Sequence, residues 1–172
     1  MGIRGVVGLC SHLPVLATCI ANTLGDVLEL GAGVYSTPVI HWLCAMTDRN
    51  VLTLDSDPEW IAMLAHYRTP AHKIEHSPEP FRDSRITDRP WGLAFVDGAA
   101  NERGPCLERL HQPRFVVVHD TEPRHLNQYA GFAVALAKYK YKLDVQFPMF
   151  SNQTSILSDV EDPAITFRRA IT

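Results

Sequence analysis

The chain has 172 residues, of which 46% are apolar and 20% charged, and its formal net charge is -3. This size and composition suit one globular domain with a sizeable core, residues 1–172. The sequence has no run of Lys or Arg and no apolar stretch of membrane-spanning length, which argues against nucleic acid and membranes as partners. We therefore expect a cytoplasmic protein.

The four cysteines give no metal or disulfide pattern. They are Cys10, Cys19, Cys44 and Cys106, with no C-x-x-C pair and no zinc-type spacing. We interpret them as reduced thiols, as is usual inside the cell.

Strand-like and helix-like runs alternate along the chain. The first predicted element is a helix over residues 13–24 that ends at Gly25 and belongs to an N-terminal helical cap over residues 1–25. The later elements are strand 27–30, helix 38–46, strand 51–54, a helix from Pro58, strands 72–76, 92–96 and 115–118, helix 124–138, and a closing hairpin of strands 141–147 and 154–157. This alternation predicts a doubly wound α/β fold, with a mainly parallel sheet covered by helices on both faces.

Two local expectations accompany these elements. Helix 38–46 is expected to bury one face made of Val39, Trp42, Leu43 and Met46. The polar, proline-rich stretch 77–89 is expected to hold at most a short helix.

A glycine turn follows the first strand. Gly31 and Gly33 allow the backbone to turn tightly and to approach a ligand closely. Thr37 and Pro38 suit the N-cap and first position of the next helix, whose free N–H groups would point at that ligand. Asp55, at the end of the second strand, can accept hydrogen bonds from both hydroxyls of a ribose.

Two classes of cofactor are bound by such a turn. Dinucleotide enzymes prefer G-x-G-x-x-G, but Ser36 stands at the third glycine position. The pattern Glu29-x-Gly31-x-Gly33, followed by Asp55, resembles the first two motifs of class I S-adenosylmethionine-dependent methyltransferases. The resemblance covers about residues 26–160 and implies a seven-stranded sheet with an antiparallel final strand. Dinucleotide binding and a turn without cofactor stay open as alternatives.

The resemblance also implies a set of cofactor contacts. Hydroxyls and amides just after the glycines would meet the amino-acid carboxylate of the donor, and the region after the third strand would contact adenine. The implied cofactor-binding residues are Glu29, Gly31, Ala32, Gly33, Tyr35, Ser36, Thr37, Asp55, Ser56, Ser77 and Asp97. Trp60 suits stacking on adenine or packing in the core, and Asp57 suits capping of the helix that starts at Pro58.

The tips of the fourth and fifth strands carry the candidate catalytic residues. The motifs Val96-Asp97-Gly98 and Val118-His119-Asp120 resemble those of methyltransferase-24-like small-molecule O-methyltransferases. In such enzymes acids at these tips can hold a divalent cation, and two carboxylates would suit Mg²⁺. The histidine usual after Asp-Gly is replaced here by Ala99-Ala100-Asn101, which weakens the case for a metal. The metal-free alternative makes His119 the general base. The catalytic candidates are Asp97, His119 and Asp120.

Two further residues are candidates for substrate binding. Arg103 can clamp a carboxylate or phosphate, although a solvated surface arginine is the simpler interpretation. His12 lies in a segment able to fold over the pocket.

Three function classes fit these features. The first is methyl transfer to a small-molecule or sugar-like hydroxyl, the second is other chemistry on the same donor, and the third is a non-catalytic donor-binding subunit. The short chain also fits a homo-oligomer that completes its pocket across subunits. The stretch 97–100 lacks the Asp/Asn-Pro-Pro-aromatic motif of adenine-N6 methyltransferases, which argues against that nucleic-acid activity.

Overall fold

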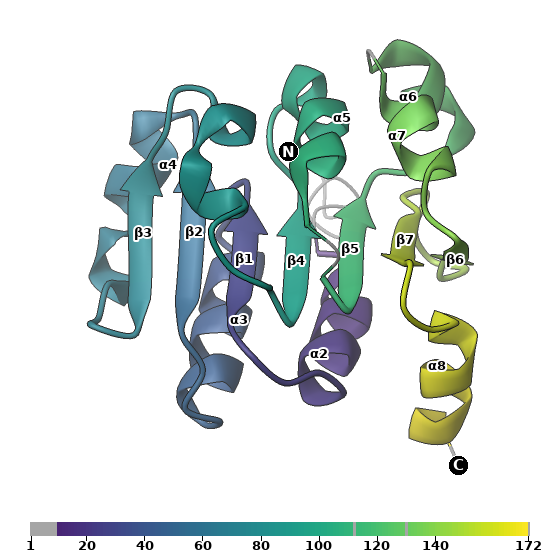
Figure 1. Cartoon of the computed structure of the whole chain (residues 1–172), viewed down its shortest axis with the longest axis horizontal. Helices are drawn as coiled ribbons and strands as arrows, with labels where there is room; N and C mark the ends of the chain where they lie inside the picture. Colours follow the sequence, from purple (N-terminus) through teal and green to yellow (C-terminus); the bar gives the residue numbers. More distant parts are fainter. Residues whose placement is uncertain (1–9, 112, 130, 172) are drawn as a thin grey trace.

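The computed structural model describes residues 10–111, 113–129 and 131–171. Within these residues a seven-stranded sheet has the order β3-β2-β1-β4-β5-β7-β6 (Figure 1). Its strands are β1 Val27–Leu30, β2 Val51–Asp55, β3 His72–His76, β4 Leu93–Val96, β5 Phe115–His119, β6 Tyr141–Val145 and β7 Thr154–Ser158. Strand β7 pairs antiparallel with β5 and β6, whereas the pairs among β1 to β5 are parallel. The expected mainly parallel sheet with an antiparallel last strand is confirmed.

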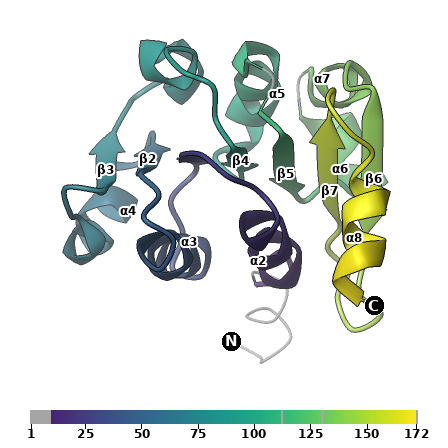
Figure 2. The same cartoon turned by 60° about the horizontal axis from the view of Figure 1, so that its bottom comes forward.

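Helices cover both faces of the sheet, as Figure 2 shows. The helices are α2 Leu13–Ala21, α3 Ser36–Ala45, α4 Pro58–Met63, α5 Ala100–Arg109, α6 Pro123–Gln128, α7 Phe132–Ala137 and α8 Pro163–Ile171. Apolar residues of α2 and α3 pack on one face and those of α5 and α7 on the other. The central strands are therefore buried on both sides, which explains why they are apolar at nearly every position.

Several helix boundaries differ from the expectation. Helix α2 ends at Ala21, because Asn22 and Thr23 turn their side chains back onto the carbonyls of Thr18 and Cys19. The predicted helix 124–138 is broken into α6 and α7, where Gly131 adopts a left-handed φ of 70°. Helix α8 has no counterpart in the predicted elements. The first nine residues of the expected N-terminal cap lie outside the described residues.

The expected buried face of helix 38–46 is wrong. Helix α3 begins at Ser36, and Trp42 and Met46 are 60% and 79% exposed. Thr37 is therefore inside the helix, not its N-cap. The side that faces the sheet carries Ser36, Thr37, Ile40 and Cys44. Both hydroxyls bond a buried carboxylate on β1, and these bonds set which side of α3 points inward.

The stretch 77–89 contains only the short 3₁₀ helices η2 Pro80–Arg82 and η3 Ser84–Ile86, as expected; a further one, η1 Ala65–Tyr67, follows α4. In the described part of the chain, no helix has both the length and the apolarity that crossing a membrane requires.

Candidate functional site

A cavity of about 360 Å³ opens at the carboxyl ends of β1, β2, β4 and β5. This is where ligands bind in doubly wound sheets. We divide its wall into two halves. The glycine-turn half consists of Ala32, Gly33, Val34, Tyr35, Ser36, Asp55, Ser56, Asp57 and Trp60. The strand-tip half consists of His12, Asp97, Gly98, Ala99, Arg103, His119 and Asp120.

The two glycines of the turn have different reasons for lacking a side chain. Gly31 has a φ of 102°, and a Cβ there would lie 2.3 Å from the amide nitrogen of Gly98. The glycine is therefore required by the close approach of the chain after β4. At Gly33, which lines the cavity, a Cβ would lie 3.0 Å from Ser36 Oγ. Gly33 is thus the glycine that leaves the backbone accessible from the cavity.

Asp55 ties the glycine turn to the tip of β2. Its Oδ2 accepts a hydrogen bond of 2.7 Å from the Ala32 amide, and its Oδ1 accepts one of 2.7 Å from the Asp57 amide. Burial raises the pKa of Asp55, against the lowering effect of these two bonds. Each carboxylate oxygen keeps acceptor capacity toward the cavity. Asp57 caps α4 through a 2.8 Å bond from the Glu59 amide, as the sequence predicts.

Glu29 lies beneath the turn and not in the cavity wall. The side chain is fully buried, and its carboxylate accepts hydrogen bonds from the hydroxyls of Ser36 at 2.6 Å, Thr37 at 2.9 Å and Thr53 at 2.7 Å. Burial raises the pKa of Glu29 to about 7, although the three hydroxyls lower it. Glu29 therefore supports the turn from below.

In the strand-tip half, Arg103 joins the candidate catalytic residues into one cluster. Its Nη2 donates to Asp97 Oδ1 at 2.8 Å, and its Nη1 lies 3.4 Å from Asp120 Oδ2. The guanidinium also donates to the backbone carbonyls of Gly98 and His119. Arg103 is buried, so it is not a solvated surface arginine.

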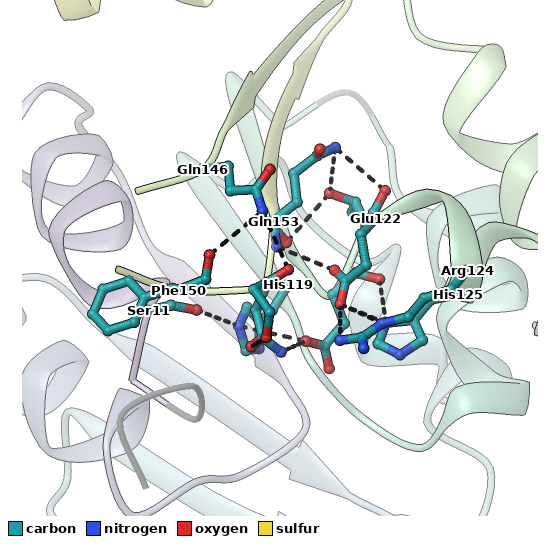
Figure 3. A network of polar contacts seen from close by, with 12 residues as sticks. Ser11, His119, Glu122, Arg124, His125, Gln146, Phe150 and Gln153 are labelled. Atoms are coloured by element: carbon teal, nitrogen blue, oxygen red, sulfur yellow. Dashed lines mark hydrogen bonds and ion pairs between the residues drawn. The ribbon is translucent and has the colours of Figure 1, made fainter. Parts of the chain in front are cut away.

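His119 is held at both ring nitrogens. Its Nδ1 lies 3.2 Å from Asp97 Oδ2, and its Nε2 lies 2.9 Å from Ser11 Oγ, which points toward the ring in Figure 3. Burial lowers the pKa of His119, but the bond to Asp97 and the charges of Asp97 and Asp120 outweigh it, so the pKa is raised overall. An ionised carboxylate only accepts, so Nδ1 carries the proton and Nε2 is left as an acceptor.

Asp120 is the second acid of the cluster. Its backbone adopts a left-handed φ of 57°, and its Oδ1 accepts a 2.7 Å bond from Asn152 Nδ2. Burial raises the pKa of Asp120, but His119, the Asn152 bond and Arg103 together lower it overall. Asp120 is therefore ionised at neutral pH.

His12 is the one described side chain with buried nitrogens that have no hydrogen-bond partner. It is 2% exposed, and its ring centroid lies 4.9 Å from that of Phe95 and 4.6 Å from that of His119. Burial lowers the pKa of His12 to about 4, so the ring is neutral. An unpaired buried polar group is costly, and here it lies in the cavity wall, where a ligand can satisfy it.

Two groups of side chains bring metal-type ligand atoms close together. They are His12, Asp97 and His119, and Asp120, Glu122 and His125. In the second group Glu122 also meets Arg124, as Figure 3 shows. The Mg²⁺ site considered from the sequence needs both Asp97 and Asp120, but Arg103 contacts both carboxylates. A guanidinium at this place opposes a divalent cation, so the residues do not fit that site well.

The structure brings most of the predicted site residues together, but not all. Glu29, Gly31, Thr37 and Ser77 are absent from the cavity wall. Ser77 is buried, and its amide donates to the Asp55 carbonyl at 2.9 Å. Sequence reasoning missed Ser11 and Asn152, whose partners lie 108 and 32 residues away along the chain. No local motif marks such distant pairs.

No protein-family model and no curated protein sequence matches the chain. Solved structures with a similar fold include a Podospora anserina methyltransferase bound to S-adenosylhomocysteine, 14% identical, covering 86% of this chain and 77% of that one, with a TM-score of 0.61. A Streptomyces achromogenes O-methyltransferase in complex with S-adenosylmethionine is 14% identical over 92% and 90% of the two chains, with a TM-score of 0.57. The C-terminal domain of a Rhodobacter capsulatus precorrin-6Y methyltransferase is 11% identical over 84% and 86%, with a TM-score of 0.55. These likenesses show the fold that the chain shares with them.

Proposed function

Since the chain has the fold of class I S-adenosylmethionine-dependent methyltransferases, we propose that it transfers a methyl group from S-adenosylmethionine to a small-molecule hydroxyl. The observation that carries this proposal is one cavity with two unlike halves. The glycine-turn half offers amides, hydroxyls and the carboxylates of Asp55 and Asp57. The strand-tip half offers His119, whose Nδ1 lies 3.2 Å from Asp97 Oδ2 and whose Nε2 lies 3.6 Å from Asp120 Oδ1.

The glycine-turn half would hold the donor. Asp55 would accept from the ribose hydroxyls, and the amides of Tyr35 and Ser36 with the Tyr35 hydroxyl, at the start of α3, would meet the donor's carboxylate. Trp60, which lines the cavity, would stack on the adenine. Gly31, Glu29, Thr37 and Ser77 shape this half from behind its wall, and Ser56 and Asp97 complete the contact with the donor.

The strand-tip half would hold the acceptor and take its proton. Methyl transfer is an in-line displacement, so the protein mainly positions the two reactants and removes a proton. Asp97 keeps the proton of neutral His119 on Nδ1, which leaves Nε2 to accept. The Ser11 hydroxyl lies 2.9 Å from Nε2, and the acceptor hydroxyl takes over this position. After transfer, the charges of Asp97 and Asp120 stabilise the imidazolium.

Arg103 and His12 have supporting parts in this proposal. Arg103 pairs with both acids and supplies the positive charge that a metal would otherwise bring. Neutral His12 offers one donor and one acceptor, both without protein partners, to a polar group of the acceptor.

The first experiment is calorimetry with S-adenosylmethionine, S-adenosylhomocysteine and NAD on the same protein. We expect binding of the first two and little of NAD; tighter binding of NAD would contradict the proposal. Incubation with the donor and a panel of small hydroxylated acceptors, followed by mass spectrometry, tests the chemistry. Donor breakdown without a methylated product would favour the second function class, and donor binding without turnover the third.

A further inference from the structure

A line of polar groups crosses the core of the protein beneath helix α3. Glu29 on β1 and Thr53 on β2 are partners in the sheet register, and His72 comes from β3 on the same face. All three side chains are at most 2% exposed. Their surroundings on this face are apolar, and the methyl-transfer proposal uses neither Thr53 nor His72.

These groups form a continuous chain of hydrogen bonds. Thr53 Oγ1 lies 2.7 Å from Glu29 Oε2 and 2.9 Å from His72 Nε2, and His72 Nδ1 lies 3.1 Å from His41 Nδ1. His41 is half-buried on α3, which gives the chain an end at solvent. At the other end Ser36, which lines the cavity, bonds Glu29 Oε1 at 2.6 Å. The line therefore runs from the surface to the cavity wall.

The direction of every bond follows from the charge of Glu29. An ionised Glu29 accepts from all three of its hydroxyl partners, so the Thr53 oxygen must accept from His72 Nε2–H. His72 Nδ1 then carries no proton and accepts from His41 Nδ1–H. In this state both imidazoles are neutral.

The same chain of hydrogen bonds can also form with donor and acceptor exchanged at each bond between His41 and Glu29. A proton that arrives at His41 Nε2 releases the Nδ1 proton of His41 to His72 Nδ1. His72 passes its Nε2 proton to the Thr53 oxygen, and Thr53 passes its own hydroxyl proton to Glu29. The result is one added proton, a neutral Glu29, two neutral imidazoles, and no donor left without an acceptor.

We propose that His41, His72 and Thr53 form a reversible proton relay that sets the charge of Glu29, and that this charge lets the site distinguish the cationic methyl donor from its uncharged product. The inference rests on the proposed function. S-adenosylmethionine carries a sulfonium charge that S-adenosylhomocysteine lacks, so a carboxylate beneath the turn favours the donor. His41, His72 and Thr53 act through Glu29 and are positioning residues.

The surroundings of Glu29 support a titration near neutral pH. Within the described residues Glu29 has no ion pair; Asp55 from β2 and Cys44 from α3 are the acidic groups that face it, and β4 presents the apolar Phe95. Burial raises its pKa to about 7, so Glu29 is ionised above this pH and neutral below it. Burial, helped by nearby His41, lowers the pKa of His72 to about 4, which keeps its ring neutral throughout.

The first test needs no ligand. Nitrogen-15 NMR of the full chain distinguishes the two neutral tautomers of His72. We expect the Nε2–H form at pH 8.5 and the Nδ1–H form at pH 5.5, with no conversion to imidazolium. One unchanged tautomer across this range would overturn the relay.

The second test measures the ratio of donor affinity to product affinity by calorimetry between pH 5.5 and 8.5. We expect the ratio to fall about tenfold as the pH drops, the size expected of one charge acting through protein. In Glu29→Gln the ratio should stay at its acidic value. Any pH dependence left in that variant belongs to His119 in the cavity, because His12 stays neutral over this range.

Two variants locate the relay. His72→Phe removes the acceptor that the reversed state needs, so the midpoint of the ratio should move to lower pH. His66→Gln removes an exposed histidine that bonds the Met63 carbonyl and packs on Tyr67 but makes no hydrogen bond to the relay, and its midpoint should match wild type. The relay is contradicted if the affinity ratio does not change with pH, or if the midpoint in His72→Phe equals that of wild type. Neither result contradicts methyl transfer. Failure to bind either ligand contradicts the proposed function, and the tautomer measurement still tests the relay.

Discussion

The two halves of the cavity differ in how far apart along the chain their partners lie. In the glycine-turn half, Asp55 bonds amides 23 and 2 residues away. In the strand-tip half, His119 bonds Asp97 and Ser11, which are 22 and 108 residues away, and Asp120 bonds Asn152, 32 residues away. The first half is built from backbone amides and the second from charged side chains. A local motif therefore specifies the glycine-turn half, whereas the strand-tip half depends on the assembled fold.

The largest effect is expected behind the cavity wall at Gly31, where the glycine turn approaches the chain that follows β4. Gly31→Ala places a Cβ 2.3 Å from the Gly98 amide nitrogen in a residue with φ of 102°. We expect a loss of about 2–5 kcal/mol in the free energy of unfolding, from strain and overpacking together. Urea denaturation measures it. Gly131→Ala is the control, since it has a φ of 70° but open space, and should cost about 1–2 kcal/mol. If both variants lose the same free energy of unfolding, the close approach of Gly31 to Gly98 does not explain the loss.

The next effect is confined to the strand-tip half. His119→Ala should lower kcat by about 10²-fold or more, because the general base is lost, and leave donor affinity unchanged. The exposed His111→Ala is the control. In wild type, kcat should fall as the pH drops, because His119 becomes protonated; its pKa is raised above 6.5, so this fall lies near or above neutral pH. Full turnover in the variant would place the base elsewhere.

A smaller effect is expected in the glycine-turn half. Asp55→Ala should weaken donor binding by about 1–3 kcal/mol, the range for a lost hydrogen bond to a charged group. At saturating donor, kcat should stay close to wild type. Calorimetry checks the first statement and steady-state kinetics the second. The surface variant Asp88→Ala should bind donor normally. A folded Asp55→Ala protein with wild-type affinity would argue against the ribose contact.

The smallest effect is expected from a chelator, which tests whether Arg103 or a metal ion supplies the positive charge in the strand-tip half. Because Arg103 already contacts Asp97 and Asp120, we expect turnover to be unchanged by a chelator. The measurement is the rate with and without chelator, followed by added Mg²⁺. If the rate falls and Mg²⁺ restores it, Arg103 must leave the acids during the reaction, and the metal-dependent mechanism is correct.

Much of the fold could be predicted from the sequence, because the apolar strands and their spacing are local signals. Residues 72–76 coincide with β3, and the predicted and observed bounds of β1 agree. The orientation of α3 could not be predicted, since its buried side is set by hydroxyls that bond Glu29 and not by apolar residues. Hydrophobic periodicity placed Trp42 and Met46 inside, where neither lies.

The candidate site was predictable to the extent that strand ends converge. Asp55, Asp97, His119 and Asp120 follow apolar runs, and the structure places all four in one cavity. The state of Arg103 was not predictable, because its burial depends on two acids and two carbonyls from separate strand tips. The relay beneath α3 was equally hidden, since Thr53 and His72 look like ordinary strand residues.

The bond between Ser11 and His119 also bears on the order in which the protein acquires its properties during refolding. It joins residues 108 apart, so it closes a very long loop, whereas the contact between Ala32 and Asp55 closes a loop of 23 residues. Closing a longer loop costs more chain entropy. A refolding chain should therefore regain the ability to hold the donor before it regains the ability to use it.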